Sequence, residues 1–136
     1  MKKIAISVRN RIFSESVFFM LRQTGKFNPV IIPSADPYMV AGECVSQKPD
    51  LLFMDVVPET HETGLGARLK VIDTVHEKFP ECRNILLWDE TAYPELTEAI
   101  VSAKKEHLID ALFNVSVTAK ELTAALSSMQ PQRKTR

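Results

Sequence analysis

Asp55 is the residue whose position most clearly suggests chemistry. It lies in the run Leu51–Val56, whose other residues are apolar on both faces, as in a central strand of a parallel sheet. A carboxylate at the end of such a strand is costly to bury unless water, a metal ion or a cation meets it. Taken alone, Asp55 could also be a solvated residue that starts a turn.

Other polar residues could share the same edge of a sheet. The carboxyl ends of parallel strands meet at one edge, where open α/β sheets bind their ligands. Four segments follow the expected strands at that edge: residues 8–10, 55–58, 88–90 and 113–114. Asp89 and Glu90 could join Asp55 and the Val57 carbonyl around a metal ion, since hard cations prefer oxygen ligands. Solvated loop acids that begin the next helix are the simpler interpretation.

Short apolar runs alternate with amphipathic stretches along the whole chain. Strands are expected at residues 4–8, 30–32, 51–56, 84–88 and 108–113. Helices are expected at residues 11–23, 37–47, 67–79, 94–106 and 118–129. These strand-then-helix units predict an α/β fold, a five-stranded parallel sheet flanked by helices in the flavodoxin-like order 2-1-3-4-5.

Local signals support several of these boundaries. Asp36 followed by Pro37 is typical of a helix start, with an N-cap carboxylate and proline at the first helical position. Thr118 and Glu121 have the spacing of a capping box. Gly25 suits the end of the first helix.

The charge balance excludes several functions for the folded body. Seventeen Lys and Arg balance seventeen Asp and Glu, so the formal net charge is zero. General nucleic-acid and membrane-surface binders need a large basic field.

No apolar run approaches the roughly 18 residues of a membrane span. The run 4–8 is too short for a signal peptide. We expect a cytoplasmic protein in which Cys44 and Cys82, which lack metal-ligand spacing, are reduced thiols.

The chain is expected to hold one domain and a short tail. Residues 1–129 carry all the expected elements, whereas residues 130–136 are polar and basic, with three cations in the last four positions. The tail could be a disordered end. It could also begin a linker to a DNA-binding domain that this chain lacks.

Residues 2–129 resemble the receiver domain of two-component response regulators. Lys-Pro-Asp-Leu-Leu-Phe-Met-Asp (48–55) is similar to the third-strand signature of regulators with a LuxR-type helix-turn-helix output domain. Ile-Phe-Ser-Glu-Ser-Val (12–17) is similar to their first-helix opening, and residues 120–126 to their final helix. The resemblance implies that Asp55 occupies the phosphoacceptor position, to which a histidine kinase transfers a phosphoryl group.

The sequence departs from the family at nearly every other site position. The family holds Mg²⁺ with two acidic residues after the first strand, and holds the phosphoryl oxygens with a hydroxyl after the fourth strand and a lysine after the fifth. An aromatic residue three positions before that lysine reports phosphorylation. The residues at these positions are Val8, Arg9, Trp88 (or, with an insertion, the nearby Thr91), Asn114 and, for the aromatic residue, Ala111.

These departures predict a pseudo-receiver that keeps the fold and loses phosphorylation. Asp55 with the Val57 carbonyl is a poor Mg²⁺ site, because Mg²⁺ needs octahedral geometry and usually one or two carboxylates plus waters. We predict that Arg9 forms a bidentate ion pair with Asp55 in place of the metal, so no cofactor is expected. Signalling would then be non-enzymatic and would regulate transcription. It would use a homodimer or a partner protein on the surface of the fourth helix, fifth strand and fifth helix, and DNA would bind only to the missing domain.

Two alternatives remain at this stage. A phosphorylation-competent receiver would need Mg²⁺, with Asp89 or Glu90 in place of the missing acids and Thr91 in place of the missing hydroxyl. A loop around His61 loosely resembles that of cobalamin-binding domains, but it follows the third strand instead of the first. An FMN site is disfavoured because residues 7–12 lack glycine.

Overall fold

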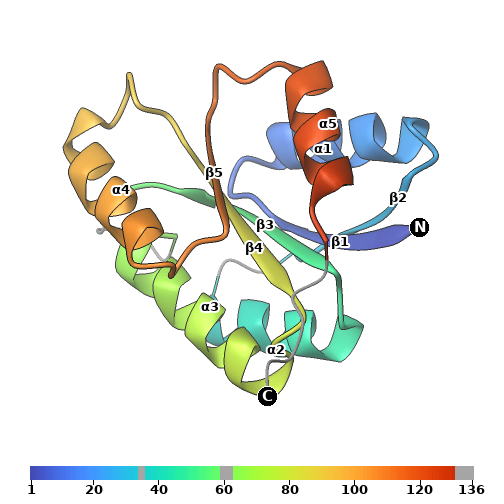
Figure 1. Ribbon diagram of the computed structural model, residues 1–136, viewed down its shortest axis with the longest axis horizontal. Helices are drawn as coiled ribbons and strands as arrows, with labels where there is room; N and C mark the ends of the chain where they lie inside the picture. Colours follow the sequence, from blue (N-terminus) through green and yellow to red (C-terminus); the bar gives the residue numbers. More distant parts are fainter. Residues whose placement is uncertain (34–35, 59–62, 131–136) are drawn as a thin grey trace.

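Five parallel strands form one sheet in the order β2-β1-β3-β4-β5 (Figure 1), which confirms the predicted fold class and strand order. The structure is a computed structural model that describes residues 1–33, 36–58 and 63–130. The strands are β1 (Lys2–Ser7), β2 (Phe27–Ile31), β3 (Leu51–Val56), β4 (Arg83–Trp88) and β5 (Ala111–Asn114). The helices are α1 (Arg11–Gln23), α2 (Pro37–Gln47), α3 (Leu65–Lys78), the 3₁₀ turn η1 (Pro94–Leu96), α4 (Thr97–Lys105) and α5 (Ala119–Ser128).

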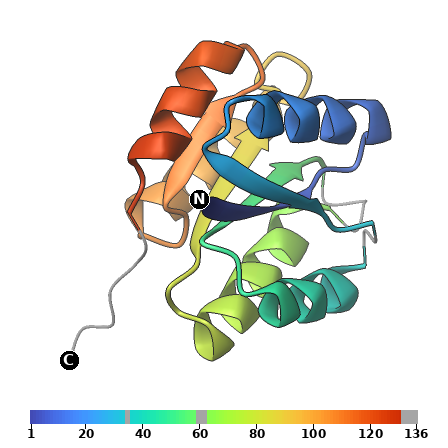
Figure 2. The same ribbon diagram turned by 90° about the vertical axis from the view of Figure 1, so that its right-hand side faces the viewer.

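The helices cover the two faces of the sheet and create two cores. Figure 2 shows α1 and α5 on one face and α2 and α3 on the other. The core under α1 and α5 includes Phe53 and Leu87, and the opposite core, which α4 also joins, includes Met54 and Trp88. Successive residues of β3 therefore enter opposite cores, as the two-residue period of a strand requires.

Local chemistry explains where the helices begin. Asp36 accepts hydrogen bonds from the backbone N–H groups of Tyr38 and Met39 at 2.8 and 3.4 Å, and Pro37 follows as the first helical residue. Thr118 and Glu121 form the predicted capping box at the start of α5. Gly25, just after α1, has a φ of +72°, a backbone conformation that glycine adopts at little cost.

Several predicted boundaries differ from the structure, and the largest differences are at the starts of β2, β5 and the fourth helix. Strand β2 begins at Phe27 and contains Pro29, which is tolerated because β2 lies at the edge of the sheet. Strand β5 begins at Ala111 instead of Leu108, and Asp110 just before it exchanges side-chain and backbone hydrogen bonds with Asn84. The helix expected from residue 94 starts as η1 and becomes α-helical at residue 97.

No helix among the described residues is both long enough and apolar enough to cross a membrane.

Candidate functional site

Asp55 lies near the carboxyl end of β3, the central strand of the sheet. It is paired in register with Leu87 on β4, and its side chain is 16% exposed. Strand β1 is the neighbour on the other side, where Ser7 is paired with Met54. Asp55 therefore lies where the sequence predicts it, at the carboxyl ends of the strands and next to the end of β1.

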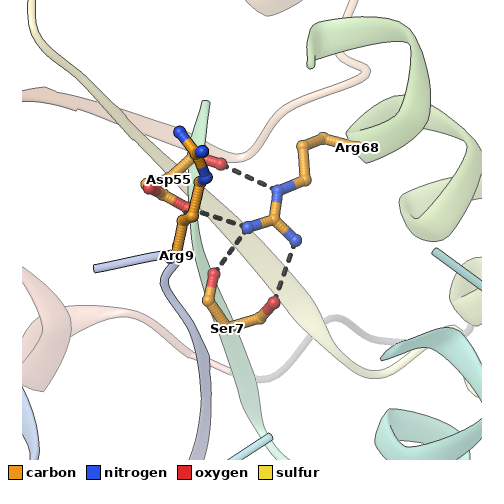
Figure 3. Close-up of polar contacts among 4 residues, drawn as sticks. All are labelled: Ser7, Arg9, Asp55 and Arg68. Carbon is orange, nitrogen blue, oxygen red and sulfur yellow. Dashed lines mark hydrogen bonds and ion pairs between the residues drawn. The ribbon is translucent and has the colours of Figure 1, made fainter. Parts of the chain in front are cut away.

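The guanidinium of Arg68, a residue of α3, binds Asp55 and the end of β1 together (Figure 3). Its Nη2 lies 2.8 Å from Asp55 Oδ1, which makes an ion pair, and its Nε donates to the Asp55 carbonyl oxygen at 2.8 Å. Nη1 donates to the Ser7 hydroxyl at 2.9 Å, and Nη2 donates to the Ser7 carbonyl at 2.7 Å. One side chain thus connects one helix to two strands.

Arg68 is almost fully buried, with 1% of its side chain exposed. It lies on the buried face of α3 together with Leu65, Val71, Ile72 and Val75. Burial lowers the pKa of the Arg68 guanidinium, while the charge of Asp55 and its hydrogen bond act in the opposite direction. Arginine stays protonated in proteins, so the site holds a buried, paired cation.

The predicted ion pair between Arg9 and Asp55 is wrong in its partner. Arg9 is exposed, and its contribution is a hydrogen bond from its backbone N–H to Asp55 Oδ1 at 3.2 Å. Among the described residues, the ion-pair partner of Asp55 is Arg68. Arg68 reaches Asp55 from α3 (Figure 3), whereas Arg9, two residues after the end of β1, is exposed.

The other predicted site positions make no hydrogen bond or ion pair with Asp55 or Arg68 among the described residues. Val8 is half-buried beside the end of β1. The Trp88 indole belongs to the opposite core and donates to the hydroxyl of Thr97, the first residue of α4, at 3.4 Å. Asn114 accepts from the backbone of Glu90 and of Val115. The remaining two, exposed Thr91 and half-buried Ala111, lie in the loop after β4 and at the start of β5.

The donor set does not fit the Mg²⁺ ion that receiver domains hold. Among the described residues, no group of three or more His, Cys, Asp or Glu side chains could hold a metal ion. Asp89, one of the candidate ligands, accepts from the backbone N–H of Ala92, which supports the interpretation as a loop acid. The Arg68 guanidinium is bound to Asp55 Oδ1, so a cation of the protein already lies at the carboxylate that a metal ion would share. His61 and its loop lie outside the described residues.

The main residue that sequence reasoning missed is Arg68. Its spacing carries a usable signal, because Leu65, Arg68, Ile72 and Val75 recur at intervals of three or four residues. A charged residue inside an apolar helical stripe must find a partner in the core. Ser7, the second partner, gave no comparable signal, since serine is unremarkable at the end of a strand.

Comparison with known proteins gives the class of the fold. No family model matches the chain, and no curated protein matches it. Among solved structures, a response regulator receiver domain protein from Clostridium thermocellum superposes with a TM-score of 0.70 at 16% identity, covering 93% of this chain and 91% of that chain. The receiver domain of the response regulator NarL from Mycobacterium tuberculosis superposes with a TM-score of 0.67 at 18% identity, covering 92% of each chain.

A third structure is described as a member of a family of redox sensors in the streptococci that evolved from two-component response regulators. It superposes with a TM-score of 0.72 at 12% identity, covering 94% of this chain and 50% of that chain. At these identities the likeness concerns the fold. The chain has the fold of a response regulator receiver domain, as the sequence resemblance predicts, and Arg68 is bound to Asp55 at the carboxyl end of β3.

Proposed function

We propose that this chain is a pseudo-receiver, a signalling module that acts through protein contacts without phosphorylation of Asp55. The observation that supports the proposal is the buried ion pair between Arg68 and Asp55. Phosphoryl transfer to an aspartate needs charge neutralisation by a metal and an accessible carboxylate oxygen. Here the positive charge is part of the protein, since Arg68 is bound to Asp55 Oδ1, and it disfavours a metal cation at the same carboxylate.

The signal is proposed to reach a partner protein through the surface of α4, β5 and α5. This surface exposes Val101 and Leu108, which are 39% and 45% accessible, among polar residues. Trp88 lies behind it, with its indole bonded to the first residue of α4. By resemblance to LuxR-type regulators, the partner function would be transcription regulation, with DNA contacted by a domain outside this chain.

A metal titration tests the proposal. Mg²⁺ followed by beryllofluoride, a phosphoryl mimic, is added to the unchanged protein while calorimetry records heat and Trp88, the single tryptophan, reports fluorescence. We expect no saturable response. The double variant Arg9→Asp with Arg68→Ala adds a carboxylate after β1 and removes the buried cation, so it should gain Mg²⁺ binding. Arg11→Asp with Arg68→Ala makes the same charge change with the new carboxylate at an exposed residue of α1, so it is the matched control and should stay silent.

A phosphorylation-competent receiver is the second candidate. The observation that favours it is that Asp55 keeps 16% of its side chain exposed at the sheet edge, within reach of solvent. A saturable Mg²⁺ response in the unchanged protein would contradict the pseudo-receiver and support this candidate, with a histidine kinase as the phosphoryl donor.

A further inference from the structure

A large groove runs between α2 and α3, on the face of the sheet opposite α1 and α5. The two helices lie side by side in both views (Figures 1 and 2). The groove has a volume of about 1020 Å³, and its lining is mostly apolar. It contains neither Asp55 nor any residue of α4, β5 or α5, so it is separate from the site and from the partner surface proposed above.

The two rims of the groove differ in shape. The α2 rim carries Tyr38 and Met39, which are 85% and 57% exposed although both are large and apolar in character. The start of the α3 rim carries Gly66 and Ala67, whose side chains are small. Exposed aromatic and methionine side chains beside an apolar groove are typical of a protein–protein contact surface.

The two rims also differ in charge. Glu43 lies on the α2 rim, and Lys70 and Lys78 lie on the α3 rim. Within the described part of the chain, neither Glu43 nor Lys70 takes part in an ion pair, so Lys70 does not neutralise Glu43 within one molecule. Each molecule therefore presents an acidic rim and a basic rim on either side of one apolar strip.

The large and the acidic side chains of α2 lie at the same heights along the helix axis as the small and the basic side chains of α3. Both helices follow a strand of the parallel sheet and start at the same edge of it, so they run in the same direction (Figure 1). Tyr38 is one residue after the start of α2, as Gly66 is one residue after the start of α3. Glu43 is six residues after the start of α2, and Lys70 is five residues after the start of α3.

We propose that this groove is a self-association surface that binds a second copy of the same chain. A two-fold axis in the plane of the contact, parallel to the groove, would place the α2 rim of each protomer on the α3 rim of the other. Tyr38 of one protomer would then cover Gly66 and Ala67 of the other, and Glu43 would meet Lys70. The symmetry makes each of these two contacts twice in the dimer.

Sedimentation velocity of the full chain over a range of concentrations tests the proposal. We expect a monomer–dimer equilibrium in the unchanged protein. Tyr38→Asp should raise the dissociation constant by roughly tenfold or more, because it removes two aromatic contacts and places two charges in the interface. Two matched controls should leave it unchanged: Ile12→Asp, 77% exposed on α1, and Leu108→Asp, 45% exposed before β5. Urea unfolding checks that all variants are folded.

A charge exchange then tests the predicted pairing. Glu43→Lys and Lys70→Glu should each raise the dissociation constant several-fold, and the variant that carries both should return it close to that of the unchanged protein. A monomer at every concentration would overturn the proposal and assign the groove to a different partner. Loss of the dimer in Ile12→Asp or Leu108→Asp, with Tyr38→Asp unaffected, would overturn it in favour of a dimer through α1 or through the α4, β5 and α5 surface. Failure of the double exchange to restore association would also overturn it.

Discussion

At the scale of single residues, the burial of Arg68 costs free energy, and its four hydrogen bonds offset that cost. A buried guanidinium loses its hydration, and the attraction to one carboxylate rarely exceeds that loss. Arg68 therefore adds hydrogen bonds to both oxygens of Ser7 and to the Asp55 carbonyl. The net stabilisation by the pair can be small, whereas the loss of one partner leaves several buried polar groups without a hydrogen bond.

The removal of Arg68 should show this asymmetry. We expect Arg68→Leu to lower the free energy of unfolding by about 3 kcal/mol, because Asp55 and Ser7 lose their partner in the core. The double variant Arg68→Leu with Asp55→Leu should recover a large part of that loss, since it removes the uncompensated carboxylate. Urea unfolding followed by circular dichroism measures both. A loss below about 1 kcal/mol in the single variant would show that the pair is not needed to satisfy buried groups.

Within this one site, the sequence predicts the position of Asp55 at the end of its strand but not the arginine that pairs with it. Asp55 could be predicted because an apolar run that ends in a carboxylate is conspicuous in the sequence itself. The sequence does not decide which arginine is its partner. Arg9 and Arg68 are both cations, and their positions along the chain do not show which of them lies near Asp55. Only the orientation of α3 over the sheet edge brings Arg68 to Asp55, and that orientation depends on the packing of the whole helix.

At the scale of elements, α5 is short, and its N-terminal cap should matter for its stability. Thr118 accepts a hydrogen bond from the backbone N–H of Glu121 at 3.0 Å, and Glu121 accepts one from the backbone N–H of Thr118 at 3.0 Å. We expect Thr118→Ala to lower the free energy of unfolding by about 1 kcal/mol, as for other N-caps. Thr123→Ala, a change of the same size within α5, is the control in urea unfolding. An equal loss in both variants would contradict the role of the cap.

The same cap should give α5 a dependence on pH. Hydrogen bonds from the backbone and side chain of Thr118 lower the pKa of Glu121 below its usual 4.5. A lowered pKa in the folded state means that the contribution is fully present above pH 4.5 and is lost as the pH falls through the folded pKa. We expect Glu121→Gln to flatten this acid-side part of the stability curve, measured by urea unfolding at several pH values. An unchanged slope would show that Glu121 has no part in it.

The elements also show which boundaries a sequence determines. Helices α1 and α2 and strand β3 begin and end where the pattern predicts, because a cap or an uninterrupted apolar run defines each end. Strand β5 does not, because it begins at Ala111, three residues later than predicted. Leu108 and Ile109 continue the apolar run, so the sequence pattern alone extends the strand over them.

At the scale of the whole molecule, the two cysteines belong to one of the two cores. Cys44 on α2 and Cys82 before β4 are 0% and 5% exposed, in the core on the side of α2 and α3. Cys82 lies in the segment between α3 and β4, and its side chain is buried there. A hydrogen bond with Cys44, together with burial, raises the pKa of the Cys82 thiol far above its usual value. Burial thus protects both thiols from reagents, and protonation protects Cys82 in addition.

Thiol labelling should therefore report the opening of the whole molecule. We expect both cysteines to react with a disulfide reagent at least about a thousandfold more slowly in the folded protein than in urea, because the reagent reaches these buried thiols only after the core opens. Arg68 lies on α3, which packs over this core, and its replacement lowers global stability.

Arg68→Leu should consequently accelerate the labelling of both thiols by the same factor that it changes the unfolding equilibrium constant, roughly a hundredfold for a loss of about 3 kcal/mol. Labelling is measured by absorbance under conditions where closing is faster than reaction. Fast reaction of Cys82 with slow reaction of Cys44 would contradict this expectation. It would show that the segment before β4 opens locally, so that this core does not unfold as one cooperative unit with the Arg68–Asp55 pair.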